Sequence, residues 1–183
     1  PLYQRPMPRV SVLVASYNCA PYLSQTLKSA LDQTYSDFEV IVVDDGSTDD
    51  TKSGLARYEG HPKLRILFQD NAGPSAAFNR ARRVATGEYL AVLDGDDVCW
   101  PTRLARQVAY LDDVAAVAVL GVRARLVTEK GRAFGVLNYP SDASAVGAKM
   151  WPAGSGPEPA FCGPSVMMRA KLVEQVGGWN EAY

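Results

Sequence analysis

The stretch Val10-Ser11-Val12-Leu13-Val14-Ala15-Ser16-Tyr17-Asn18 decides how this chain should fold. A short β-branched run that ends in polar residues is typical of a strand buried on both faces of a parallel sheet. Pro21 follows, and it opens a segment whose apolar residues lie on one face of a helix, namely Leu23, Leu27, Ala30 and Leu31. We therefore expect a strand that ends near Ser16 and a helix that packs back on its sheet.

The same alternation continues to about residue 100. The pattern predicts strands at Phe38–Val43, Leu64–Phe68 and Tyr89–Leu93, with helices at Asp49–Tyr58 and Ser75–Thr86. Strands and helices in alternation indicate right-handed βαβ crossovers. The predicted fold class is α/β, with a Rossmann-like, mostly parallel central sheet and helices on both of its faces.

The second half is less regular. A helix is expected from Pro101 to about Leu111, followed by strands of a mixed sheet in the apolar runs Ala116–Leu120 and Val122–Val127 and a turn at Lys130-Gly131. The Pro- and Gly-rich stretch Trp151–Pro164 predicts a loop across the face of the site. A strand at Ser165–Met168 and a helix at Ala170–Val176 complete the prediction, in which both halves share one sheet and one domain.

Composition restricts the classes of function. The 183 residues are 47% hydrophobic and 21% charged, and 19 basic against 20 acidic residues leave a net charge of −1. Such a balance suits a soluble domain and gives no field that would attract nucleic acid, so no nucleic-acid partner is expected. Three dispersed cysteines and the single His61 make neither a zinc site nor a disulfide framework, which favours the cytoplasm.

Polar residues follow each of the four predicted strands. The groups are Ala15–Asn18, Asp44–Ser47, Asp70–Gly73 and Asp94–Asp97. Ligands collect at the carboxyl ends of the strands in an open parallel sheet, so the four groups should share one edge. Each group also has a plain structural interpretation: Asp44–Asp49 as a helix cap, Tyr17 as a packing residue, and Asn71-Ala72-Gly73 as a turn.

The group Asp94-Gly95-Asp96-Asp97 is the hardest to explain by structure alone. Three carboxylates within four residues repel one another unless a cation neutralises them. Hard oxygen ligands favour Mg²⁺ or Mn²⁺, which usually also hold substrate phosphates. The alternative is a solvated acidic turn. No phosphate-binding Gly-rich motif is present, whereas Asp45 could accept a hydrogen bond from a uracil or thymine imide and Tyr17 could cover the ring.

These motifs, in their order and spacing, resemble family 2 glycosyltransferases. The resemblance rests on Val10–Asn18, Ser29–Tyr35, Glu39–Asp49, Gly87–Leu90 and Asp94–Asp97, and it continues through Val176–Glu181. It implies the type A glycosyltransferase fold, an inverting mechanism and a divalent metal. The donor would be a UDP-sugar, with dTDP- or GDP-sugars as alternatives. The setting would be cell-surface polysaccharide or glycolipid synthesis with a carbohydrate or lipid-linked acceptor.

The resemblance also implies site residues. Ala15, Tyr17 and Asp45 would line the nucleobase pocket, and Asp94 with Asp96 would form the Asp-x-Asp signature that contacts ribose and metal. Asp96 and Asp97 are the expected metal ligands. Asn18, Gly73 and Gly95 complete the expected nucleotide-sugar contacts. On this basis residues 9–100 would form the donor half and 101–183 the acceptor half.

Two departures from the family pattern limit this interpretation. Phe78 precedes Asn79 where the family usually has Arg, and Arg80, Arg82 or Arg83 would have to supply that charge. The chain also begins without Met and stops at Tyr183, before the expected catalytic base, so part of the protein is expected to be missing. Missing segments would also provide any peripheral attachment to the inner face of the membrane.

Two other functions remain open. A non-catalytic nucleotide-sugar-binding module would keep the donor pocket without the acceptor machinery. A nucleotidyltransferase would share the α/β pattern and the metal, but it would need a Gly-rich, basic loop after the first strand. Ser16–Pro21 contains no Gly, Lys or Arg.

Overall fold

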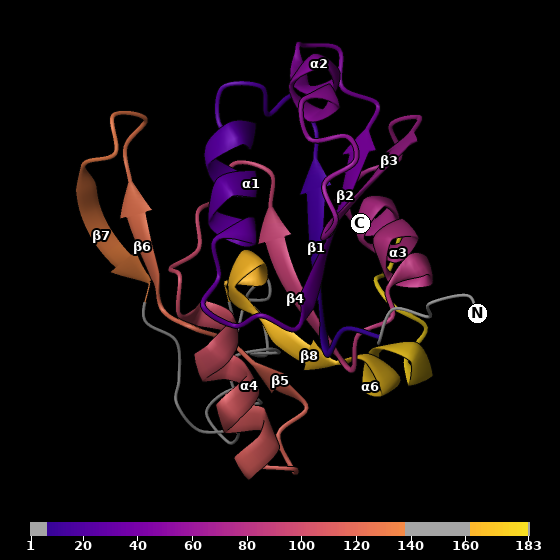
Figure 1. The fold of residues 1–183 in the computed structure, drawn as a ribbon, viewed down its shortest axis with the longest axis vertical. Coiled ribbons are helices and arrows are strands. Elements are labelled where there is room, and N and C mark those ends of the chain that lie inside the picture. The colour runs from indigo at the N-terminus through magenta and orange to yellow at the C-terminus, as the bar shows by residue number, and fades with distance from the viewer. Residues whose placement is uncertain (1–6, 138–161, 183) are drawn as a thin grey trace, which may run out of the picture.

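A six-stranded sheet in the order β3-β2-β1-β4-β8-β5 forms the centre of the computed structural model, which describes residues 7–137 and 162–182 (Figure 1). The first four strands of that order are parallel, whereas β8 runs antiparallel to both of its neighbours. The strands are β1 Val10–Ser16, β2 Phe38–Asp45, β3 Leu64–Gln69, β4 Tyr89–Asp94, β5 Val119–Leu120 and β8 Met167–Arg169. The predicted α/β class with a mostly parallel sheet is confirmed.

Helices cover both faces of this sheet because its strands are apolar on both sides. Val12 and Val14 of β1 pack in one cluster with α1 (Leu23–Leu31), α2 (Thr51–Ala56) and α4 (Arg103–Asp113). Leu13 points the opposite way, into a cluster with α3 (Pro74–Val84) and α6 (Ala170–Gln175). The alternation along one strand thus produces two cores, one on each side of the sheet.

The strands β6 (Ala124–Val127) and β7 (Ala133–Leu137) form a separate antiparallel hairpin, at the left of Figure 1. The expectation that Val122–Val127 joins the central sheet is therefore wrong, and β7 was not predicted. The polar segment between the strands closes a tight turn, in which the Gly131 N–H donates to the Thr128 carbonyl oxygen at 2.7 Å. Arg125 lies exposed in the middle of β6, a position that a doubly covered sheet would not tolerate.

Other boundaries differ by a few residues. The second helix ends at Ala56 rather than Tyr58, because the chain tightens there, with the Tyr58 N–H bonded to the Leu55 carbonyl oxygen, and then turns at Gly60. The last strand begins two residues later than predicted, after a 3-10 turn at Gly163–Ser165. Residues 151–161 of the predicted loop lie outside the described residues.

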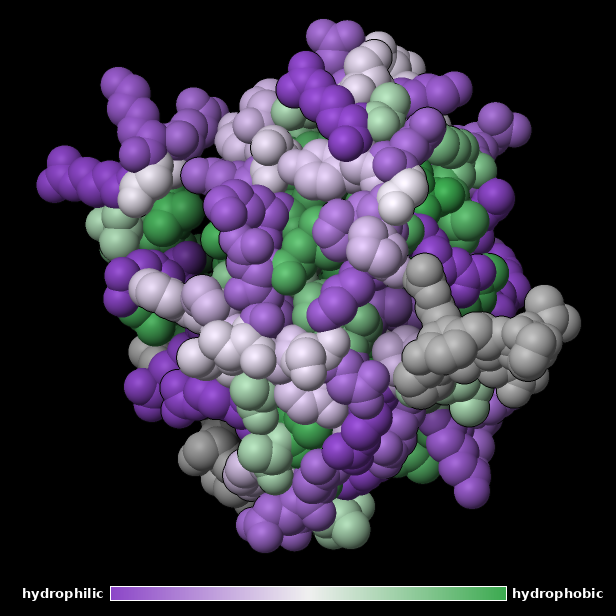
Figure 2. Space-filling view, in the orientation of Figure 1, coloured by the Kyte–Doolittle hydropathy of each residue, from purple (hydrophilic) through white to green (hydrophobic). Residues whose placement is uncertain are grey.

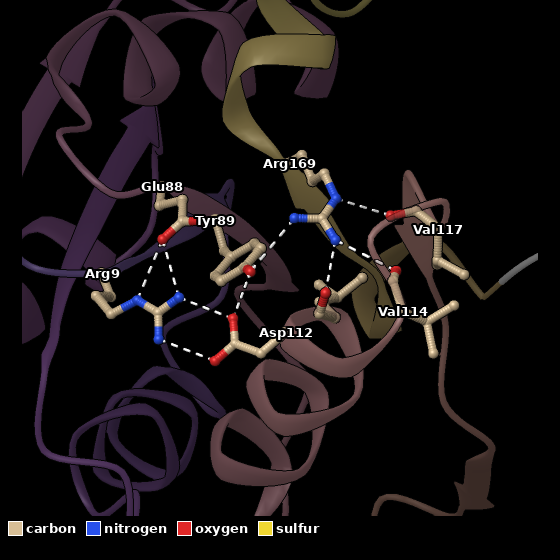
Figure 3. Close-up of polar contacts among 8 residues, drawn as sticks. Arg9, Glu88, Tyr89, Asp112, Val114, Val117 and Arg169 are labelled. Carbon is tan, nitrogen blue, oxygen red and sulfur yellow. Dashed lines mark hydrogen bonds and ion pairs between the residues drawn. The ribbon is translucent and has the colours of Figure 1, made fainter.

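A cluster of polar side chains lies at the amino ends of β1 and β4 (Figure 3). Arg9 donates to both carboxylate oxygens of Asp112, at 2.8 and 3.0 Å, and forms an ion pair with Glu88. The Tyr89 hydroxyl donates to Asp112 at 2.7 Å, and the Tyr89 ring lies between the guanidinium groups of Arg9 and Arg169. These donors, Arg9 first, lower the pKa of Asp112.

Arg169 ties this cluster to the end of α4. Its guanidinium donates to the carbonyl oxygens of Leu111, at 2.6 Å, and Val117, at 2.9 Å (Figure 3). The carbonyls of a last helical turn have no partner within the helix, so this side chain serves as its cap. The end of the sheet opposite the carboxyl ends of its parallel strands is therefore stabilised by ion pairs and hydrogen bonds.

Candidate functional site

The carboxyl ends of β1, β2, β3 and β4 lie side by side, as their order requires (Figure 1). Ala15 of β1 is level with Asp94 of β4, and Ser16 is level with Asp44 of β2. Asp45 is level with Gln69 at the end of β3. The prediction that the four polar groups share one edge is confirmed.

Hydrogen bonds join the loop after β1 to the loop after β2. The Asn18 side-chain oxygen accepts from the backbone N–H of Thr48, at 2.8 Å, and of Asp49, at 3.3 Å. Ser47 accepts from the Asn18 N–H at 2.9 Å and donates to Asp44. Asn18, predicted to contact the donor, thus has its amide oxygen engaged inside the protein, and its backbone takes the left-handed conformation at φ 52°.

Asp45 positions the loop that follows β3. Its carboxylate accepts from Gln69 Nε2 at 2.6 Å and from the backbone N–H groups of Ala72, at 2.9 Å, and Gly73, at 2.8 Å. A carboxylate offers about four acceptor positions, so one is unused here, and Asp45 is 3% exposed. The role predicted for Asp45 in nucleobase binding is compatible with this geometry, but the sequence had not indicated its structural role.

The other residues predicted for the nucleobase lie around this pair of loops. Tyr17 is 48% exposed, as a stacking platform would be, and Ala15 is half-buried at the end of β1. Gly73 precedes α3 in a left-handed conformation, φ 88°. Phe68, next to the end of β3, is also exposed and has the Lys52 ammonium 5.2 Å from its ring centroid.

The acidic loop after β4 is held close to the end of β1. The Gly95 N–H donates to the Ala15 carbonyl oxygen at 2.9 Å, and Thr26 of α1 donates to the Gly95 carbonyl at 2.9 Å. A Cβ atom at Gly95 would lie 3.0 Å from that carbonyl oxygen and from the Cys19 sulfur, so a side chain there would require its neighbours to shift. Sequence reasoning missed Thr26, whose signal was a polar residue on the buried face of a helix.

The three carboxylates of this loop repel one another. Burial first, and then the charges of Asp97 and Asp96, raise the pKa of Asp94 to about 6. Burial and Asp96 also raise the pKa of Asp97, against the opposing charge of Arg103. Asp96 itself is exposed. A cation at this loop would relieve the repulsion, as the sequence analysis expected.

The donor set fits a hard divalent cation held jointly with a ligand. In residues 7–137 and 162–182, no three His, Cys, Asp or Glu side chains converge closely enough to hold an ion by themselves. Mg²⁺ and Mn²⁺ sites commonly use one or two carboxylates and complete their shell with water and substrate phosphates. Asp96 and Asp97 would be the protein ligands in such an arrangement.

Arg103, which the sequence analysis did not single out, lies buried beneath this loop. Its guanidinium donates to Gln107 Oε1 at 3.0 Å and to the carbonyl oxygens of Val92, at 2.8 Å, and Val166, at 3.2 Å. Burial lowers its pKa. Arg103 thus places a positive charge beneath the acidic loop, and its hydrogen bonds link β4 to the segment before β8.

The segment after α6 packs on α3. Phe78 stacks on Trp179 with 5.5 Å between ring centroids, and the side-chain amide of Asn79 bonds to both backbone polar groups of Trp179. Asn79 also donates to Glu181 at 2.7 Å. Phe78 is therefore a packing residue for Trp179. Arg82 and Arg83 belong to the last turn of α3, the end that lies away from Gly73.

The model of glycosyl transferase family 2 matches residues 11–177. The chain belongs to glycosyltransferase family 2. EpsE of Bacillus subtilis (strain 168) is 36% identical over 94% of this chain and 60% of its own length. The chondroitin synthase of Escherichia coli is 44% identical over 52% of the chain and 14% of its own length. This family 2 chain thus spans less than two thirds of either relative.

Solved structures of glycosyltransferases share the fold. S. aureus TarS in complex with UDP superposes with a TM-score of 0.71 at 25% identity, over 95% of this chain and 51% of that one. The mannosyltransferase PcManGT from Pyrobaculum calidifontis, in complex with GDP-Man and Mn²⁺, gives 0.69 at 29% identity, over 96% and 48%. The expectation of a type A glycosyltransferase fold is confirmed.

Proposed function

We propose that this chain is the donor-binding part of a metal-dependent, inverting glycosyltransferase that transfers a sugar from a nucleoside diphosphate sugar to an acceptor hydroxyl. The acidic loop Asp94–Asp97 carries the proposal: it is fastened to the end of β1, and β1 separates it from the carboxylates that end β2. Its carboxylates are placed to repel one another unless a cation is shared with a ligand. A nucleoside diphosphate supplies the phosphate oxygens for such sharing.

The residues divide the work within the donor site. Tyr17 and Ala15 would flank the base, and the remaining acceptor position of Asp45 would receive an imide N–H. Asp94 and Asp96 would face the ribose and metal, Asp96 and Asp97 would hold the ion, and Gly73 and Gly95 would let the backbone approach the ligand. When bound, the divalent cation neutralises charge that develops on the departing diphosphate.

A uridine nucleotide is the first donor to test, and a lipid-linked or carbohydrate acceptor is the proposed partner in cell-surface polysaccharide or glycolipid synthesis. TarS has been solved with UDP and with UDP-GlcNAc, and PcManGT with GDP-Man, which supports nucleotide-sugar binding and keeps both bases in the comparison. We propose residues 9–100 as the donor half and 101–183 as the acceptor half. None of the helices in the described ranges has the length and apolar character needed to cross a bilayer.

Calorimetric titration with UDP, GDP and dTDP, in Mn²⁺ and in EDTA, tests the donor site without an acceptor. We expect UDP to bind in Mn²⁺ only, and Asp96→Ala to weaken binding at least about tenfold, the loss of one charge-assisted contact. Asp113→Ala, at the far end of α4, is the matched control and should bind as the unaltered chain does. Tighter binding of GDP would change the proposed donor, and no binding of any nucleotide would refute the donor site.

A further inference from the structure

Exposed apolar side chains gather on the β6–β7 hairpin and on the loop beside it. In the described part of the chain, twelve large hydrophobic residues are exposed, and six of them lie in these two segments: Val98, Trp100, Val122, Val127, Phe134 and Val136. Phe134 is 67% and Trp100 69% exposed, the highest values for aromatic residues in that set. Such clustering marks an interaction surface, whereas scattered exposed residues need no explanation.

The pleat of the hairpin separates its two faces. Arg125 of β6 is level with Val136 of β7, and both are exposed, as are Val127 and Phe134. Ala124, Leu126, Gly135 and Leu137 are half-buried on the other face. The outer face of the hairpin therefore carries apolar and cationic side chains together.

The same segment concentrates positive charge. Residues 122–137 contain Arg123, Arg125, Lys130 and Arg132 against the single anion Glu129, a net charge of +3 in a chain whose total is −1. All five side chains are exposed. In Figure 2 hydrophilic and hydrophobic residues gather side by side at the left, where Figure 1 places β6 and β7. The rest of the chain is accordingly net negative, so the positive field is local.

Contacts connect this surface to the candidate donor site. The Arg125 guanidinium lies 6.0 Å from the ring centroid of Trp100, which follows Asp97 by three residues. A partner that binds the hairpin would therefore lie close to the acidic loop. The hairpin itself contacts neither core cluster through its outer face, so that face is not needed to hold the fold.

We propose that the outer face of the β6–β7 hairpin, with Trp100, docks on the surface of a bilayer that contains anionic phospholipid. Cations near such a surface attract headgroup phosphates, while Phe134, Val136 and Trp100 enter the boundary between headgroups and acyl chains. Trp100 suits that depth because its ring is apolar and carries a polar N–H, and Phe134 adds apolar area alone. The proposal concerns the chain's own residues and needs no nucleotide, so it stands or falls separately from the proposed activity.

Sedimentation with vesicles measures the docking. The unaltered chain should bind vesicles of equal parts phosphatidylglycerol and phosphatidylcholine, and bind pure phosphatidylcholine at least tenfold more weakly. Arg123→Gln with Arg132→Gln should reduce the partition coefficient roughly 25-fold, about fivefold for each cation. The matched control is Arg57→Gln with Lys171→Gln, which removes the same charge from exposed positions just after α2 and on α6 and should change binding less than about twofold.

A second pair of variants tests the apolar contribution. Phe134→Ser should weaken binding at least about tenfold, because the bilayer would no longer bury an aromatic side chain between its headgroups and acyl chains. Val176→Ser, at the exposed end of α6, should leave it unchanged. Circular dichroism of each variant checks that the hairpin change leaves the fold intact.

Three outcomes would overturn the proposal. They are the absence of binding to anionic vesicles, equal losses in hairpin and control variants, and equal binding to both lipid mixtures. Self-association of the chain that Phe134→Ser abolishes, without vesicle binding, would instead assign this face to a second copy of the chain.

Discussion

Asn79 and Trp179 hydrogen bond to each other twice, although one hundred residues separate them. The Asn79 side-chain amide donates to the Trp179 carbonyl oxygen at 2.8 Å and accepts from the Trp179 N–H at 2.9 Å. The amide thus satisfies both backbone polar groups of Trp179, as a paired residue of a neighbouring strand would. Asn79 is buried, so both bonds are protected from water.

Replacement of Asn79 by Ala should destabilise the fold by about 2 kcal/mol, because two backbone groups of Trp179 lose their partner in a half-buried position. Urea denaturation measures the loss. Asn180→Ala, one residue from Trp179 and exposed, should stay within about 0.5 kcal/mol of the unaltered chain. Equal effects of the two substitutions would show that the tether contributes nothing.

Gly46 should tolerate no side chain. It adopts φ +72°, and a Cβ atom there would lie 2.6 Å from the Asn71 backbone nitrogen, which cannot move without disturbing the loop after β3. Gly46→Ala should therefore cost about 3 kcal/mol or more, from strain and overlap together. Gly60 has a similar φ of +79° with open space around it, so Gly60→Ala should cost only about 1 kcal/mol. Equal costs in urea denaturation would contradict this account.

Asp45→Asn should reduce both stability and nucleotide affinity. The amide has one acceptor oxygen where the carboxylate has two, so the N–H of Ala72 or of Gly73 would face a donor instead. We expect a loss of about 2 kcal/mol in unfolding free energy and at least about tenfold in UDP affinity. Gln69→Ala leaves the carboxylate in place and should change affinity about threefold at most. Unchanged affinity in Asp45→Asn would remove Asp45 from the site.

The Arg9–Asp112 ion pair should make stability depend on pH in acid. The pKa of Asp112 is lowered in the folded chain, so its contribution is present above the unfolded pKa of about 3.9 and is lost as the pH falls through the lower folded value. Because the Asp112 side chain is 41% exposed, its contribution is at most about 1 kcal/mol.

Urea denaturation of Asp112→Asn and the unaltered chain should therefore differ at pH 7 and converge near pH 2. Asp113→Asn, on the next residue, should match the unaltered chain at both pH values. A gap for Asp112→Asn that persists at pH 2 would mean that packing rather than charge explains it.

The first four strands were predictable because each is a short, largely apolar run that ends in polar residues; β1, β2 and β4 are buried on both faces, whereas β3 at the edge of the sheet is partly buried. That Asp45 and Asp94 lie at the same end of the sheet follows from parallel pairing alone. The place of the β6–β7 hairpin was not predictable in the same way, since the pattern of Val122–Val127 indicates a strand and only its partner decides where it lies. The spacing of hydrophobic residues indicates whether an element is a helix or a strand, but it does not indicate which element lies beside it.

Within the candidate site, sequence spacing identified the carboxylates but not what holds them. Thr26 and Arg103 lie on helices, on positions that local periodicity marks as core, and they donate to the carbonyl oxygens of Gly95 and Val166, which are 69 and 63 residues away in sequence. Asn18 showed the reverse problem. Its place in a family motif suggested ligand contact, whereas its oxygen holds the loop after β2. Such long-range bonds have no local signature.

The position of β8 sets an order of events while the chain is being made. β4 gains its outer neighbour, and β5 its pairing in the central sheet, only when Met167–Arg169 arrives, more than seventy residues after β4 ends. Until then the edge of β4 at Tyr89–Ala91 offers unpaired N–H and C=O groups to other chains. During synthesis, a growing chain at this stage is therefore the form most in need of protection from aggregation.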